Sequence, residues 1–92
     1  MPRVRLLLPA SLRRYWSAPE AIDLAGATLA EAMADLARQD PGIADRILDE
    51  RGRPRPHVHL FVNGESLGSR DLAAVALREG DVVRALPAVS GG

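Results

Sequence analysis

Residues 20–40 read EAIDLAGATLAEAMADLARQD, and the spacing of the apolar residues changes partway along this stretch. Over residues 20–25, Ile22 and Leu24 fall on one face at a period of two, which is the pattern of a strand with one buried face. After Gly26 the apolar positions continue at helical spacing, and this stripe consists of Leu29, Ala32, Met33 and Leu36. The stretch therefore predicts a strand followed by an amphipathic helix.

Polar residues mark both ends of that helix. Thr28 is the predicted N-cap, and Glu31, three residues further on, completes a capping box. The run Asp40-Pro41-Gly42 ends the helix, because the residue before a proline avoids helical geometry. A second, shorter helical segment is predicted at about 43–49, and it would bury Ile43 together with Ile47 or Leu48.

The chain before residue 20 supplies a partner for the predicted strand. Residues 3–8 form a first strand, because Val4, Leu6 and Leu8 share one face at a period of two. Pro9 ends it, and residues 10–19 are expected to form a loop or wide turn that contains Tyr15 and Trp16. The two strands would pair antiparallel.

Two further strands are predicted after the helices. Residues 57–62 place Val58, Leu60 and Val62 on one face, and Asn63-Gly64 is a strong turn signal. Residues 65–81 are mixed, with Leu67, Leu72 and Leu77 as expected core contacts. Gly80-Asp81 then turns the chain into a last strand at about 82–88.

This order of elements defines the fold class. A hairpin, a crossover helix and a return to the same sheet make an α+β fold of the β-grasp type, with a mixed sheet and one main helix packed on one face. The crossover lets the first and last strands lie parallel at the sheet centre. We expect a domain over residues 1–88, a flexible tail over 89–92, and a core that includes Val4, Leu6, Ile22, Leu29, Met33, Leu36, Leu60, Val62 and Val83.

Composition excludes several classes of function. The 92 residues include no cysteine, so thiol chemistry, disulfides and cysteine-ligated metal are excluded. Twelve acidic residues balance twelve basic ones, all of which are arginine, and this balance argues against nucleic acid or membrane as a partner. The apolar run near the start is too short for a signal peptide, so a cytoplasmic location is expected by default.

Few side chains in the chain suggest a catalytic or metal centre. His57 and His59 share a strand face and could form half a metal site, but no third ligand is evident, so we expect no metal. The serines have no obvious paired base, and no glycine-rich phosphate loop is present. The basic-aromatic run over residues 13–16 is interpreted as an amphipathic loop at the sheet edge rather than as a nucleic-acid contact. We therefore expect no bound cofactor and no catalytic residue.

The last seven residues, Leu86-Pro87-Ala88-Val89-Ser90-Gly91-Gly92, have a different character. Pro87 stops ladder pairing and directs the chain out of the sheet. Gly91 and Gly92 lack a Cβ, so such a tail could pass through a narrow channel and present its carboxylate to a nucleotide. A free carboxylate is a poor acyl donor. If ATP converted it to an acyl-adenylate, however, sulfur could displace AMP and leave a thiocarboxylate.

Three segments together resemble a known family. They are residues 61–65 (FVNGE), residues 77–83 (LREGDVV) and residues 86–92 (LPAVSGG). The Gly-Asp-x-Val turn, the proline and the terminal Gly-Gly have the separations found in the bacterial ubiquitin-like sulfur carriers. That family includes the molybdopterin synthase small subunit, the thiamine sulfur carrier and the cysteine-biosynthesis carrier, and the last of these is the most similar.

The resemblance implies a β-grasp fold and a chain that other enzymes act upon. Gly92 would be the site of adenylation and thiocarboxylate formation, with Val89, Ser90 and Gly91 as the rest of the tail. Phe61 and Leu86 would be partner contacts, although both could also be ordinary core residues. The implied partners are an ATP-dependent activating enzyme, a sulfur donor enzyme or sulfide, and a sulfur-accepting synthase.

Other functions remain open at this level. The chain could be the sulfur-carrier subunit of molybdopterin synthase, which serves molybdenum cofactor biosynthesis. It could be a protein modifier that forms isopeptides through Gly92, and the absence of lysine would then limit it to single conjugates. It could also be an interaction domain that needs no free C-terminus. An enzyme in its own right has the least support, for want of a convergent site.

Overall fold

The computed structural model describes residues 1–13 and 19–87. Tyr15 and Trp16 of the predicted loop, and the predicted tail over 89–92, lie outside the described residues. The described elements are β1 (Arg3–Leu7), α1 (Ala10–Arg13), β2 (Ala21–Ala25), α2 (Leu29–Gln39), α3 (Pro41–Ile47), β3 (Val58–Val62), β4 (Glu65–Ser66), the 3-10 turn η1 (Leu72–Ala74) and β5 (Val82–Pro87).

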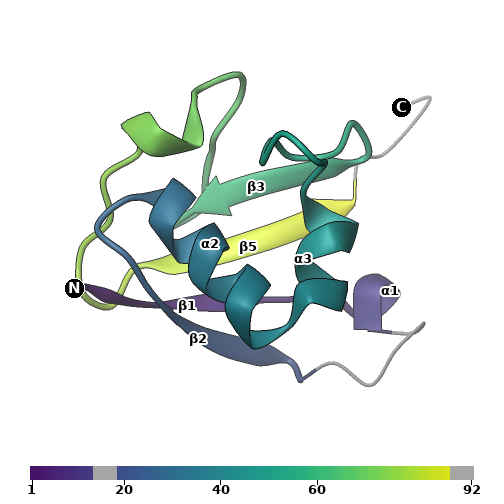
Figure 1. The fold of residues 1–92 in the computed structure, drawn as a ribbon, viewed down its shortest axis with the longest axis horizontal. Helices are drawn as coiled ribbons and strands as arrows, with labels where there is room; N and C mark the ends of the chain where they lie inside the picture. The colour runs from purple at the N-terminus through teal and green to yellow at the C-terminus, as the bar shows by residue number, and fades with distance from the viewer. Residues whose placement is uncertain (14–18, 88–92) are drawn as a thin grey trace.

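The five strands form one mixed sheet in the order β2-β1-β5-β3-β4. β1 and β5 are parallel neighbours in the middle of the sheet, and the other pairs are antiparallel. Figure 1 shows α2 and α3 lying across the same face of this sheet. This is the predicted β-grasp arrangement. α2 is the predicted main helix, and the shorter α3, which corresponds to the predicted second helical segment, covers the same face.

The core lies between that face of the sheet and the two helices. Its most completely buried side chains are Leu6, Leu24, Leu29, Met33, Leu36, Ile43, Ile47, Leu60 and Val83. No polar or charged residue is buried among residues 1–10, 13 and 19–87, whose burial the structure describes. The predicted core is confirmed except at Val62, which packs against the core but is only half-buried. Val62 is the last residue of β3, beside the exposed Asn63-Gly64 turn, so it is covered on one side only.

Hydrogen bonds fix the start of α2 as the sequence predicts. Thr28 Oγ1 accepts from the backbone N–H of Glu31 at 3.2 Å, and Glu31 Oε1 accepts from the N–H of Ala27 at 2.8 Å. The box therefore closes one residue earlier than the usual capping box, which closes on the N-cap itself. Gly26 is required just before it, because a Cβ there would lie 2.5 Å from the backbone nitrogen of Ala32.

Asp40 ends α2 and also begins α3. Its N–H donates to the carbonyl of Leu36 at 2.7 Å, and its side chain accepts from the N–H of Ile43 at 3.1 Å. The second helix therefore begins at Pro41, before the predicted residue 43, because a proline fits the first turn of a helix. Ile43 and Ile47 are buried as predicted.

The segment after β1 differs from its prediction. A loop or wide turn was expected over residues 10–19, whereas Ala10–Arg13 form the single helical turn α1. Its backbone closes with a hydrogen bond from the N–H of Arg13 to the carbonyl of Pro9 at 3.1 Å. So short a turn carries no apolar period that a sequence pattern could reveal.

The turn before β5 is held by side chains from both sides. Asp81 accepts from Asn63 Nδ2 at 2.9 Å and from the N–H of Arg78 at 2.8 Å, and Asn63 Oδ1 accepts from the N–H of Val82 at 2.9 Å. The hydrogen bond from Asn63, followed by that from Arg78, lowers the pKa of Asp81 below its ordinary value. Asn63 and Gly64 both have positive φ, at 50° and 84°, as a tight hairpin turn requires.

We predict that Leu36→Ala lowers the free energy of unfolding by ~2–5 kcal/mol, because it empties a fully buried position under the sheet. Chemical denaturation measures the change. The exposed Ala34→Ser on the same helix is the control and should cost no more than about 0.5 kcal/mol. Equal costs for the two variants would contradict the described core.

We also predict a pH-dependent role for Asp81. Because folding lowers the pKa of Asp81 below 3.8, its contribution to stability is complete above that value and is lost as the pH falls through the folded-state pKa. Asp81→Ala should therefore cost about 1–2 kcal/mol near neutral pH and less near pH 3. Urea titrations at several pH values test this. A difference from wild type that widens in acid would contradict it.

Candidate functional site

The predicted tail follows the end of β5 in the sequence. β5 ends at Pro87, where Pro87 pairs with Val58 and Leu86 pairs with His59. Val89, Ser90, Gly91 and Gly92 follow, outside the described residues. The structure therefore places the origin of the tail at the edge of a central strand.

Phe61 and Leu86 lie on the sheet face opposite the two helices. Leu60 and Ala85, which alternate with them, point into the core. Leu86 is 36% exposed and Phe61 is half-buried. Because His59 pairs with Leu86 and Phe61 pairs with Arg84, Phe61 and Leu86 are diagonal neighbours across β3 and β5. The structure thus brings together the two predicted partner contacts and shows that Leu86 is not a core residue.

The two histidines lie close to the same end of the sheet. His57 and His59 are both exposed, and no group of three or more metal-ligating side chains occurs in the described part of the chain. His57 lines a small recess with Asp45, Arg46 and Arg55. There Arg55 Nε donates to the carbonyl of Asp45 at 2.6 Å. This arrangement ties the loop after α3 to the helix.

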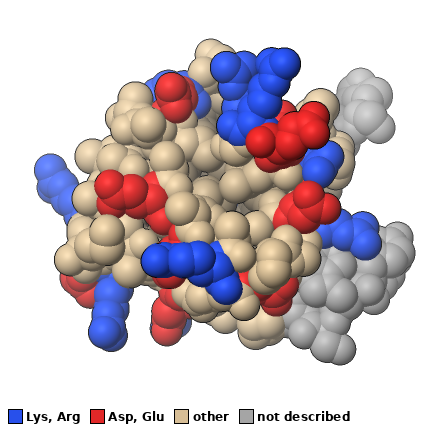
Figure 2. Space-filling model, in the orientation of Figure 1, with Lys and Arg blue, Asp and Glu red and all other residues tan. Residues whose placement is uncertain are grey.

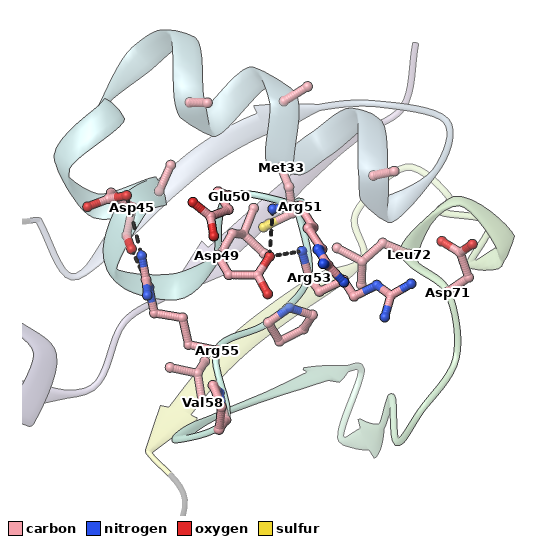
Figure 3. Close-up of a pocket in the computed structure, with 18 of the residues that line it drawn as sticks. Met33, Asp45, Asp49, Glu50, Arg51, Arg53, Arg55, Val58, Asp71 and Leu72 are labelled. Carbon is pink, nitrogen blue, oxygen red and sulfur yellow. Dashed lines mark hydrogen bonds and ion pairs between the residues drawn. The ribbon is translucent and has the colours of Figure 1, made fainter.

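A recess that was not predicted lies on the helix side of the sheet. Figure 3 shows it bounded by the helices, the arginine-rich loop over residues 49–56 and the segment near Leu72. Its volume is about 1080 Å³. Met33, Val58 and Leu72 line its apolar part. Beside this recess the loop folds back on itself through a bridge between Leu48 and Pro54. No local sequence pattern predicts that contact.

Asp49, an acidic residue that lines this recess, forms hydrogen bonds within its own loop. Asp49 Oδ1 accepts from the backbone N–H of Arg51 at 2.8 Å and of Arg53 at 3.0 Å, and the hydrogen bond from Arg53 is the main cause of the lowered pKa of Asp49. Asp45 in turn forms an ion pair with Arg55 at 3.4 Å. These carboxylates shape the loop, and they do not converge as a general acid and base would.

No helix among residues 1–13 and 19–87 is long and apolar enough to cross a membrane. The candidate site is the open sheet face around Phe61 and Leu86, together with the predicted tail that follows Pro87 in the sequence. A small β-grasp domain whose central strand leads into a Gly-Gly ending is a protein of the ubiquitin-like class.

Comparison with known proteins identifies the family. The model of the ThiS family matches residues 6–92, and the chain belongs to that family. The chain is 32% identical over 91 residues to the sulfur carrier protein CysO of Mycobacterium tuberculosis, covering 97% of this chain and 98% of that protein. It is also 32% identical over 78 residues to small archaeal modifier protein 3 of Haloferax volcanii, covering 85% of this chain and 78% of that protein.

Solved structures agree with this assignment. The crystal structure of Mycobacterium tuberculosis CysO matches with a TM-score of 0.79 and 31% identity, covering 94% of this chain and 99% of that chain. A chain of the BexX/CysO complex of Amycolatopsis orientalis matches with a TM-score of 0.79 and 27% identity, covering 97% of this chain and 99% of that chain. The predicted fold and the predicted family are both confirmed.

We predict that Leu86→Asp leaves the fold intact, because the new carboxylate stays in water. Its neighbour Ala85 is 0% exposed, so Ala85→Asp buries an unpaired charge and should unfold the domain or cost several kcal/mol. Thermal melts of the two variants form a matched test. Unfolding by Leu86→Asp would show that the open face is part of the core.

Proposed function

We propose that this protein is a sulfur carrier whose Gly92 carboxylate is adenylated and then converted to a thiocarboxylate. The observation that carries the proposal is the near full-length similarity to CysO, a sulfur carrier protein, together with a terminal Gly-Gly that follows a central strand. In this role the chain is a co-substrate of partner enzymes and not a catalyst.

The proposed chemistry balances without any group from the folded domain. An oxygen of the Gly92 carboxylate attacks the α-phosphate of ATP, and pyrophosphate leaves. Hydrosulfide, added as sulfide or released by a donor enzyme, then attacks the carbonyl carbon, AMP leaves, and loss of one proton gives the thiocarboxylate. The ATP is a substrate of the activating enzyme, and the carrier itself binds no cofactor.

The tail composition suits this chemistry. Glycines at positions 91 and 92 lack a Cβ, so they permit the close approach of an enclosing channel to the backbone. The exposed Leu86 and the half-buried Phe61 lie on the strand pair that precedes the tail, so they would contact the activating enzyme while the tail is in its channel.

The similarity to CysO favours delivery of the sulfur to a synthase that makes cysteine or another sulfur-containing metabolite. The structural match to a BexX/CysO complex supports docking of the carrier on a partner enzyme. Molybdenum cofactor biosynthesis is the alternative pathway. A cytoplasmic location suits all of these partners.

A second candidate function is protein modification. It is favoured by the similarity to small archaeal modifier protein 3, and it would use the same activated Gly92. Because the chain has no lysine, every conjugate would carry a single copy.

We predict that Gly91→Ala slows activation, because a channel that fits glycine rejects a Cβ, while the melting temperature stays unchanged. Removal of Gly92, or extension beyond it, should abolish activation. The assay mixes pure protein, ATP, a cognate activating enzyme and sulfide, and records intact mass. The expected change is one oxygen replaced by one sulfur in the C-terminal peptide.

Two results separate the candidates. If the extended protein keeps full activity in cells and no sulfur is gained in the assay, the carrier proposal fails. If lysine-linked conjugates accumulate in cells, protein modification gains support.

A further inference from the structure

Arg5 and Arg84 both lie on the open face of the sheet, and their surroundings differ. Arg5 and Asp23 are cross-strand neighbours, and Arg5 Nε lies 3.4 Å from Asp23 Oδ1. Arg84 has no acidic neighbour in the sheet, because Leu7 and Phe61 flank it in the register. Within the described residues Arg84 takes part in no ion pair or hydrogen bond through its side chain.

Arg84 is therefore an exposed cation whose direct neighbours in the register are apolar, with the exposed His59 diagonal to it. Leu7 and Phe61 are half-buried on either side of it, and Leu86 lies two residues further along the same strand. A partner that covers Leu86 and Phe61 also takes the guanidinium of Arg84 out of water. Removing an unpaired charge from water is costly, so a stable complex must offer that guanidinium an anion.

The position of Arg84 limits where that anion lies. Arg84 belongs to the strand that leads into the tail, and Gly92 follows it by eight residues. A fully extended chain of that length spans at most about 29 Å. An enzyme that holds the tail in its active site therefore presents the anion within this distance of its reaction centre.

We propose that Arg84 is the specificity-determining contact of the open face, and that it binds an aspartate or glutamate carboxylate on the enzyme that holds the tail. This inference rests on the proposed function, since it takes the activating enzyme as that partner. The partner surface is apolar around Leu86 and Phe61 and carries a carboxylate at its centre. Arginine suits this position, because its planar fork binds a carboxylate through two parallel hydrogen bonds.

Arg5 provides a matched control on the same face. Arg5 is already paired with Asp23, so a partner that covers Arg5 does not need to supply an anion for it. Arg84→Ala should weaken binding of the carrier to its activating enzyme by about 10- to 100-fold, as loss of a central interface arginine does. Arg84→Glu should weaken it further, and Arg84→Lys should restore part of the affinity. Arg5→Ala should stay within about twofold of wild type.

The experiment measures two quantities for each variant. The dissociation constant for the purified adenylating enzyme is measured without ATP, and kcat and KM for sulfur transfer are measured with ATP and sulfide. The proposal expects Arg84 variants to raise Kd and KM with kcat unchanged. It also expects added salt to weaken the wild type more than Arg84→Ala. A compensating aspartate- or glutamate-to-arginine change on the enzyme should rescue Arg84→Glu.

Several outcomes would overturn the inference. Equal effects of Arg84→Ala and Arg5→Ala would remove the special role of Arg84. So would a dimer of this chain, detected by sedimentation, that Arg84→Glu dissociates, because the open face would then bind a second copy. If the wild type binds the enzyme but gains no sulfur, the proposed function fails, while the dissociation constants still decide the role of Arg84.

Discussion

The rest of the structure depends on the burial of one helix stripe against one face of a sheet. Leu29, Met33 and Leu36 of α2 are buried beneath the strands, and Gly26 lets the chain turn tightly into that helix. This contact closes one face of the sheet and returns the chain to the same sheet after the crossover. After this crossover, β5 pairs parallel with β1 in the middle of the sheet.

β5 lies in the middle of the sheet, and it both carries residues of the open face and precedes the tail in the sequence. A strand with neighbours on both sides is held along its length, so residues 82–87 present a fixed platform at the origin of the tail. The face opposite the helices stays open along that same strand, and Arg84 and Leu86 both lie on it. The proposed docking surface therefore lies on the same central strand that the tail follows in the sequence. Figure 2 shows that on the helix side charged side chains of both signs surround a hollow instead.

Some charged side chains form hydrogen bonds that hold loops and turns of the fold, whereas the side chain of Arg84 forms none among the described residues. Asp49 and Asp81 are engaged by backbone and side-chain donors, which accounts for their lowered pKa values. The Gly-Asp motif that helped to suggest the family is thus structural in this chain, because Asp81 holds the turn that starts β5. Arg84 is the contrasting case, since it has no comparable engagement among the described residues.

The sequence by itself determined the main helix, the four longer strands, the buried stripe and the fold class. Local periodicity, the Thr28 cap and the Asn63-Gly64 turn each depend on residues close together in the chain. The tertiary structure decided which residues from distant segments meet. It set the register that places Phe61 beside Arg84 and Leu86, the half-burial of Val62 and the recess under the 49–56 loop. Strand register and loop folding depend on contacts between residues far apart in the chain, so local sequence patterns cannot predict them.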